Sequence, residues 1–131
     1  MLPYNNGGEY MSSLLETCRL LITTMQRDRL PVKVHLHRYE YYYNSIPVWS
    51  LIPPENQCTD QYTETAYVFM IGSYVYYSRE GTAVTWFERR SHAVFSRNTN
   101  LYKHTLCIDP KKRFQTLSEL EICLDAELKG K

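Results

Sequence analysis

The stretch Thr65-Ala-Tyr-Val-Phe-Met-Ile-Gly-Ser-Tyr-Val-Tyr-Tyr-Ser78 consists almost entirely of residues that favour β-strands. Aromatic and β-branched side chains are enriched in strands because they fit a pleated, half-buried surface. The pair Gly72-Ser73 interrupts the stretch, and it fits either a tight turn between two strands or a bulge in one long strand. We therefore expect residues 65–78 to lie in a β-sheet.

Strand-like patterns also occur on both sides of this stretch. Residues 32–43 alternate with period two, which is typical of a strand with one face in the core. Shorter strands are predicted over 46–52, 83–88, 92–96 and 101–108, and Arg79-Glu80-Gly81-Thr82 has the composition of a hairpin turn. Because no helix separates these segments, we expect an antiparallel, meander-like sheet of about five to seven strands.

An amphipathic helix is predicted at each end of this sheet. Ser13 and Glu16 have the spacing of a capping box, and an apolar face follows them over a helix from 13 to about 28. Thr116 and Glu119 repeat that spacing ahead of a leucine stripe, and Gly130 suits a C-cap. The predicted fold class is α+β, with residues 1–12 as a flexible tail and 13–131 as a single domain.

Composition is that of an ordinary globular domain. The chain has 131 residues, of which 44% are hydrophobic and 22% are charged. It contains no apolar run of the roughly 18 residues that a bilayer span needs, and no basic leader precedes an apolar segment at the N-terminus. We therefore expect an intracellular protein with no membrane partner. The cysteines are then expected as buried free thiols, with two disulfides as the alternative for an exported chain: Cys18, Cys58, Cys107 and Cys123.

His35-Leu36-His37 places two imidazoles on one face of a predicted strand. Two converging histidines suit a divalent metal ion, although exposed sheet histidines have the same pattern. The triplet resembles the metal-binding motif of rolling-circle nucleases, which implies a metal-dependent nuclease with a tyrosine nucleophile. The predicted C-terminal helix contains no tyrosine. No cofactor is otherwise expected, and His92 and His104 are further candidate ligands.

Residues 79–113 are locally basic, with eight Lys and Arg against three Asp and Glu. Aromatic residues such as Trp86, Phe87 and Tyr102 are interspersed with these charges. Cations that follow a phosphate backbone and rings that stack on bases are typical of single-strand nucleic-acid binders. Nucleic-acid binding through 79–113 is therefore one functional hypothesis.

The chain contains 12 tyrosines, more than a sheet of this size can bury with satisfied hydroxyls. Exposed tyrosine and arginine dominate protein-binding hot spots. We therefore expect a non-enzymatic module that binds another protein through a Tyr/Arg-rich sheet face, with homo-oligomers possible through that face or an edge strand. The candidate binding residues are Tyr39, Tyr41, Tyr43, Tyr76, Phe87, Arg89, Arg90 and Arg97.

One further resemblance involves the C-terminal half. The stretch Gly81-Thr82-Ala-Val-Thr-Trp-Phe87, with His92, Ile108-Asp109 and Phe114-Gln-Thr116 ahead of a helix, resembles a polo box. That family is a phosphopeptide-binding module in which a six-stranded antiparallel sheet precedes a helix. The resemblance covers about a third of the chain, and it assigns no individual binding residue.

Overall fold

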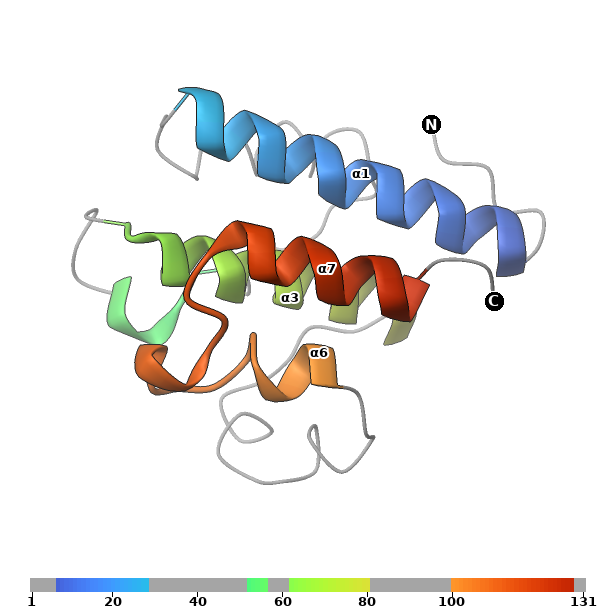
Figure 1. The fold of residues 1–131 in the computed structure, drawn as a ribbon. Coiled ribbons are helices and arrows are strands. Elements are labelled where there is room, and N and C mark those ends of the chain that lie inside the picture. The colour runs from blue at the N-terminus through green and yellow to red at the C-terminus, as the bar shows by residue number, and fades with distance from the viewer. Residues whose placement is uncertain (1–6, 29–51, 57–61, 81–99, 129–131) are drawn as a thin grey trace.

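The described part of the chain is helical. The structure is a computed structural model that describes residues 7–28, 52–56, 62–80 and 100–128. Its elements are α1 (Gly7–Asp28), η2 (Pro54–Asn56), α3 (Glu64–Glu80), α6 (Asn100–Lys103), η3 (Pro110–Lys112) and α7 (Leu117–Leu128) (Figure 1). No β-strand occurs within these ranges. The predicted antiparallel sheet with flanking helices is therefore wrong, and the chain has a helical fold.

Helix α3 replaces the strands predicted over 65–78. It is 17 residues long, and its side chains from Val68 to Tyr76 are all buried. A helix that is covered on all sides is apolar around its whole circumference, so its sequence lacks the periodic polar face of a surface helix. The same apolar run reads as strand, because burial on every side removes the periodicity that separates the two structures. The turn predicted at Gly72-Ser73 lies in the interior of this helix.

Gly72 allows the close approach of Thr105, which follows α6. A Cβ atom built at Gly72 would lie 2.3 Å from Thr105 Oγ1 and 2.4 Å from Thr105 Cβ. The Thr105 hydroxyl donates to the carbonyl of Leu101 at 2.7 Å, which fixes its position beside α3. Gly72 therefore serves helix packing and not a change of chain direction.

Helix α1 was predicted from residue 13, and it begins at Gly7. Ser13 lies well inside the helix, so the Ser13–Glu16 spacing does not mark its start. The predicted apolar face is confirmed as buried: Leu14, Leu15, Cys18, Leu21, Ile22 and Met25. In Figure 1, α1 runs in the opposite direction to α7, and Arg19 of α1 forms ion pairs with Glu121 and Asp125 of α7.

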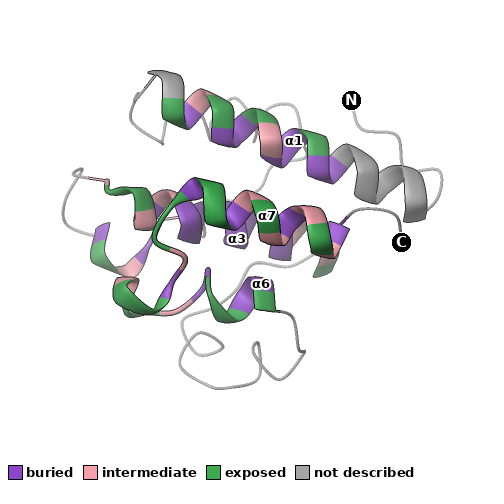
Figure 2. Cartoon of the chain, viewed as in Figure 1, coloured by how far each residue is buried: buried purple, intermediate pink, exposed green. Residues whose placement is uncertain are grey.

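Helix α7 confirms the second capping box. The amide of Glu119 donates to Thr116 Oγ1, and the amide of Thr116 donates to Glu119 Oε1, each at 3.1 Å. These reciprocal bonds satisfy amides that the first helical turn leaves without a partner. The predicted stripe faces the core, as Figure 2 shows by the buried colour along one side of α7: Leu117, Leu120, Leu124 and Leu128.

The strand predicted over 101–108 is also wrong. Leu101 and Tyr102 are buried neighbours in α6, and the chain then turns through a hydrogen bond from the amide of Leu106 to the carbonyl of Tyr102 at 3.0 Å. Asp109 caps η3 by accepting from the amide of Lys111 at 3.0 Å. The described residues of the polo-box resemblance, from Ile108 onward, thus form a 3₁₀ turn and α7, with no sheet before the helix.

Arg113 anchors the loop between η3 and α7 to the rest of the molecule. Its buried guanidinium pairs with Glu55 in η2 and donates to the carbonyl of Thr65 in α3 at 3.1 Å. It also lies 4.8 Å from the ring centroid of Phe69. One side chain therefore joins η2, α3 and the loop before α7.

The strands predicted over 32–43, 83–88 and 92–96 lie outside the described residues, as does 46–52 apart from Ile52. Gly130 also lies outside them. Among the helices that are described, none combines the length and the apolar character of a bilayer span.

Candidate functional site

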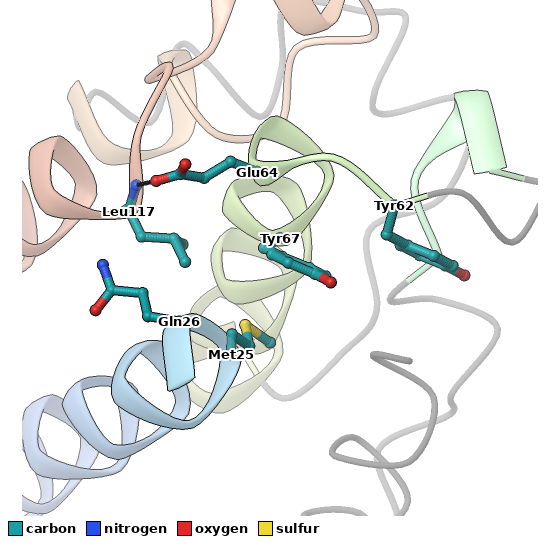
Figure 3. A pocket seen from close by; sticks show the side chains of 6 residues that line it. All are labelled: Met25, Gln26, Tyr62, Glu64, Tyr67 and Leu117. Carbon is teal, nitrogen blue, oxygen red and sulfur yellow. Dashed lines mark hydrogen bonds between the residues drawn. The ribbon is translucent and has the colours of Figure 1, made fainter. Parts of the chain in front are cut away.

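A pocket lies where α1 ends and where α3 and α7 begin. Its volume is about 580 Å³. Among the described residues its lining comes from all three helices and from the residue that lies two positions before α3: Met25, Gln26, Tyr62, Glu64, Tyr67 and Leu117 (Figure 3). We call it the junction pocket.

The walls of the junction pocket are held by the first turns of α3 and α7. The amides of Ala66 and Tyr67 donate to the carbonyl of Thr63 at 3.0 and 3.2 Å, which closes the first turn of α3. The Thr116–Glu119 capping box closes the first turn of α7 beside Leu117. Helix ends with satisfied amides are rigid supports for side chains, so the lining is positioned by secondary structure.

Glu64 and Leu117 join the two helix starts directly. Glu64 Oε2 accepts a hydrogen bond of 2.6 Å from the amide of Leu117 (Figure 3). This amide is one of those that α7 cannot satisfy internally, and a carboxylate is the preferred acceptor at a helix N-terminus. Glu64 is therefore both a wall of the pocket and a cap for α7.

Tyr62 and Tyr67 form the aromatic wall. Their rings are nearly parallel, with an interplanar angle of 9° and ring centroids 6.3 Å apart. Both rings are partly buried against the core. Aromatic pairs in this offset arrangement stabilise each other by about 0.5–1.5 kcal/mol beyond the area that they bury. The pair thus forms one aromatic surface of the pocket.

Helix α1 contributes two flexible side chains to the lining, Met25 and Gln26. Met25 is buried and offers a polarizable thioether, whereas Gln26 is exposed and offers an amide that both donates and accepts. The lining therefore offers a ligand two aromatic rings, a thioether, an amide and one carboxylate. Within the described residues, no group of three or more His, Cys, Asp and Glu side chains could hold a metal ion.

Most of the residues predicted as sites from the sequence fall outside the described ranges. These are Tyr39, Tyr41, Tyr43, Phe87, Arg89, Arg90 and Arg97, together with the candidate metal ligands His35, His37 and His92. The structure therefore neither brings them together nor separates them.

Tyr76 is the one predicted binding residue that the structure describes. It lies in α3 and is only 2% exposed, within the hydrophobic core. Its ring meets that of Tyr102 edge to face, with centroids 5.4 Å apart and an interplanar angle of 68°. Tyr76 thus serves packing between α3 and α6.

The described part of the basic segment 79–113 is divided between core and surface. The Arg79 guanidinium lies 5.8 Å from the ring centroid of the buried Tyr102. Arg113 is buried, whereas Lys103, Lys111 and Lys112 are exposed. In the described part of this segment the exposed basic residues are therefore Lys103, Lys111 and Lys112, and the acidic Glu80 and Asp109 are exposed as well.

Three cysteines and His104 belong to the described part of the chain. Cys18, Cys107 and Cys123 are free, and burial raises the pKa of all three, to about 11 for Cys123. Cys58 lies outside the described residues. His104 is exposed, and its ring centroid lies 5.3 Å from that of Phe114.

Sequence reasoning missed the junction pocket because its residues are scattered over three elements. Met25 belongs to the apolar face predicted for α1, and Tyr62 and Glu64 lie just before the strand-like stretch 65–78. The partial signal is a tyrosine on each side of Glu64, at the start of that apolar stretch. A comparison of the chain with protein-family models, with curated proteins and with solved structures finds no match.

Proposed function

We propose that this chain is a non-enzymatic module that binds another protein, and that the junction pocket receives a side chain of that partner. The observation that carries the proposal is the Tyr62–Tyr67 pair, whose rings stack in the lining of a pocket at the ends of three helices. Rigid aromatic groups supply large contact area at small entropic cost, which is why tyrosine dominates binding hot spots.

The size of the pocket supports this assignment. A volume of about 580 Å³ lies within the roughly 300–1,000 Å³ of ordinary ligand sites. Met25 adds a thioether, and methionine is favoured where a surface adapts to a partner. The pocket therefore suits one or two side chains of a bound segment.

The tyrosine-centred hypothesis is retained, but on different residues. The described part of the chain contains no sheet face. We therefore assign to Tyr62 and Tyr67 the protein-binding role that was predicted for exposed tyrosines of a strand. Nucleic-acid binding through 79–113 and a metal-dependent nuclease at His35 and His37 stay predictions, because they depend mainly on residues outside the described ranges.

A displayed library of random peptides, selected on the full chain, tests the proposed function. The affinities of selected peptides are then measured by fluorescence polarisation for the wild type, for Tyr67→Leu and for Ile122→Ala. Tyr67→Leu removes the ring and keeps apolar volume, whereas Ile122 is 72% exposed on α7 and lies outside the pocket lining.

We expect Tyr67→Leu to weaken binding by roughly 5- to 30-fold, the usual effect of losing a hot-spot tyrosine. Ile122→Ala should leave affinity unchanged. Far-UV circular dichroism of each variant separates lost binding from lost folding. The proposal is wrong if no peptide is enriched, or if the selected peptides bind folded Tyr67→Leu as tightly as the wild type.

A further inference from the structure

We propose that the loop between α6 and α7 is a second binding surface, and that it takes an acidic segment of a protein partner that also carries an apolar residue. The surface lies outside the lining of the junction pocket, so the inference goes beyond the proposed function. Its exposed residues come from the end of α6, from η3 and from the turn between them (Figure 1): Lys103, His104, Ile108, Asp109, Lys111 and Lys112. We call these six residues the loop surface.

The conformation of this loop is fixed through its backbone. Every carbonyl from 107 to 111 accepts a hydrogen bond from another part of the chain. The buried Arg113 guanidinium donates to the first two at 2.8 and 3.3 Å, and the Gln115 side-chain amide donates to the last two at 3.2 and 3.3 Å. The amide of Lys112 donates to the carbonyl between them at 3.1 Å. A loop that is already held in one conformation loses little conformational entropy when it binds a partner.

The same hydrogen bonds bring the end of α6 against η3. The thiol of Cys107 lies 2.6 Å from the carbonyl oxygen of Lys103 and 3.9 Å from that of Lys112. Nδ1 of His104 lies 3.4 Å from the same Lys112 oxygen. Lys103 and Lys112 are therefore neighbours in space, although nine positions separate them in the chain.

The loop surface is positively charged. It contains three lysines against one acid, Asp109, whose Oδ1 accepts the amide of Lys111 at 3.0 Å. Within the described part of the chain, no carboxylate forms an ion pair with any of these lysines. Glu80, the other exposed acid in the described part of 79–113, belongs to the last turn of α3. Charge complementarity therefore favours an acidic partner.

Ile108 gives the loop surface an apolar contact. Its side chain is 40% exposed, and its carbonyl is held by Arg113. An apolar centre within a charged rim is the usual composition of a protein-binding surface.

The loop surface is less suited to nucleic acid. Three lysines contact about three phosphates, whereas nucleic-acid binders with a steep salt dependence make roughly 6–10 such contacts. Single-strand binders also need exposed rings for stacking on bases. Of the neighbouring rings, Tyr102 is buried and Phe114 is half-buried, with its ring centroid 5.3 Å from that of His104.

A titration of the ¹⁵N-labelled full chain, followed by amide NMR spectra, tests the inference. The probe is an acetylated and amidated octapeptide of six glutamates around two central leucines. A matched octapeptide replaces the glutamates by glutamines, and a single-stranded deoxythymidine octanucleotide tests for phosphate binding. Ile122 is 72% exposed on α7, outside the loop surface, so its amide serves as the internal control.

We expect saturable shifts at the amides of the loop surface with the acidic peptide, and an unshifted amide of Ile122. The glutamine peptide should bind more weakly by at least about 5-fold, because several ion pairs are lost together. The oligonucleotide should also bind more weakly than the acidic peptide, and the affinity for that peptide should fall as salt is added.

Two pairs of variants separate charge from apolar contact. Lys112→Gln should weaken the acidic peptide by roughly 2- to 5-fold, whereas Arg19→Gln removes the same charge from α1 and should leave the affinity unchanged. Ile108→Ala should weaken it by roughly 2- to 10-fold, whereas Ile122→Ala should have no effect. The dispersion of each variant's amide spectrum shows that it is folded.

The inference is overturned if the loop-surface amides do not shift, or if the glutamine peptide binds as tightly as the acidic one. An oligonucleotide that binds more tightly than the acidic peptide would make the surface a phosphate-binding one. Shifts at Met25 and Tyr67 in place of the loop surface would put the peptide in the junction pocket, and they would also overturn it. The proposed function is judged separately, by the selected peptides and their dependence on Tyr67.

Discussion

Arg113 and Glu55 form a two-point ion pair across a separation of 58 positions in the chain. Nη1 of Arg113 donates to Oε2 of Glu55 at 2.6 Å, and Nη2 donates to Oε1 at 2.9 Å. The same guanidinium donates to the carbonyls of Cys107 at 2.8 Å and Ile108 at 3.3 Å. Nη1 also donates to the carbonyl of Thr65 at 3.1 Å. Since the Arg113 side chain is 0% exposed, its charge depends wholly on these partners.

Arg113→Ala is expected to reduce the free energy of unfolding by about 3–5 kcal/mol, because it leaves the Glu55 carboxylate and the carbonyls of Thr65, Cys107 and Ile108 without their donor. Arg19→Ala is the matched control: Arg19 pairs with Glu121 and Asp125 at the surface, where its side chain is 38% exposed. There the loss should be at most about 1 kcal/mol. Urea unfolding followed by far-UV circular dichroism measures both. Equal losses of unfolding free energy in the two variants would contradict the expected difference between the buried and the exposed ion pair.

Gly72→Ala should destabilise the protein by about 1–3 kcal/mol, although alanine is the better helix former. The added Cβ would overlap Thr105, whose Oγ1 and Cβ lie 2.3 and 2.4 Å from its position. Combining Gly72→Ala with Thr105→Gly should recover part of the loss, and a double-mutant cycle of unfolding free energies measures that coupling. Strictly additive losses would contradict the contact.

The capping box of α7 offers a third measurement. Thr116→Ala should cost about 1 kcal/mol in unfolding free energy, because the amide of Glu119 loses its acceptor at 3.1 Å. Ser118→Ala, at an exposed position of the same turn, should change stability by less than about 0.5 kcal/mol. Thermal and urea unfolding should rank the two variants in that order, and the reverse order would count against the cap.

Stability should fall in alkaline solution. Burial raises the pKa of Tyr102 from 10.0 to about 12, against a smaller lowering by the Arg79 guanidinium. The unfolded chain then loses its proton first, so the contribution is complete below pH 10 and disappears as the pH rises towards 12. Two pKa units correspond to about 2.7 kcal/mol.

Tyr102→Phe should show a shallower loss of stability between pH 10 and pH 12 than the wild type, measured by urea unfolding at several pH values. The raised pKa values of the thiols remain in both proteins, so the difference in slope isolates the phenol. Parallel pH profiles would show that Tyr102 does not carry this dependence.

The two terminal helices could be predicted from the sequence because their signals are local. Thr116 and Glu119 cap α7 as their spacing indicates, and the apolar stripes of α1 and α7 face the core. The start of α1 could not be predicted, because Ser13 has the residue type and spacing of a cap and yet lies inside the helix. Capping residues recur by chance, and only the chain before them decides whether a helix begins there.

Helix α3 could not be distinguished from strands by composition. Its β-branched and aromatic residues prefer strands as isolated residues, but burial on every side overrides that preference. Length was the informative signal, since an apolar run of this extent exceeds an ordinary strand and suits a central helix. The prediction of a turn or bulge at Gly72 relied on the conformational freedom of its backbone. In the structure the lack of a side chain at Gly72 is what matters, because it lets Thr105 approach α3.

The junction pocket could not be predicted because no stretch of sequence contains it. Met25, Glu64 and Leu117 come from three helices, and only their packing brings them to one place. The capping of α7 by a residue of α3 is likewise a tertiary contact. Short-range patterns predict elements, and sites of this kind arise between elements.

The hydrogen bond from Leu117 to Glu64 makes hydrogen exchange at one backbone amide a measure of events in the pocket. Separation of the start of α3 from the start of α7 breaks this bond and exposes the amide of Leu117 to solvent. A bound segment that holds the two helix starts together would slow exchange at that amide, so binding at the junction pocket can be measured at a single proton.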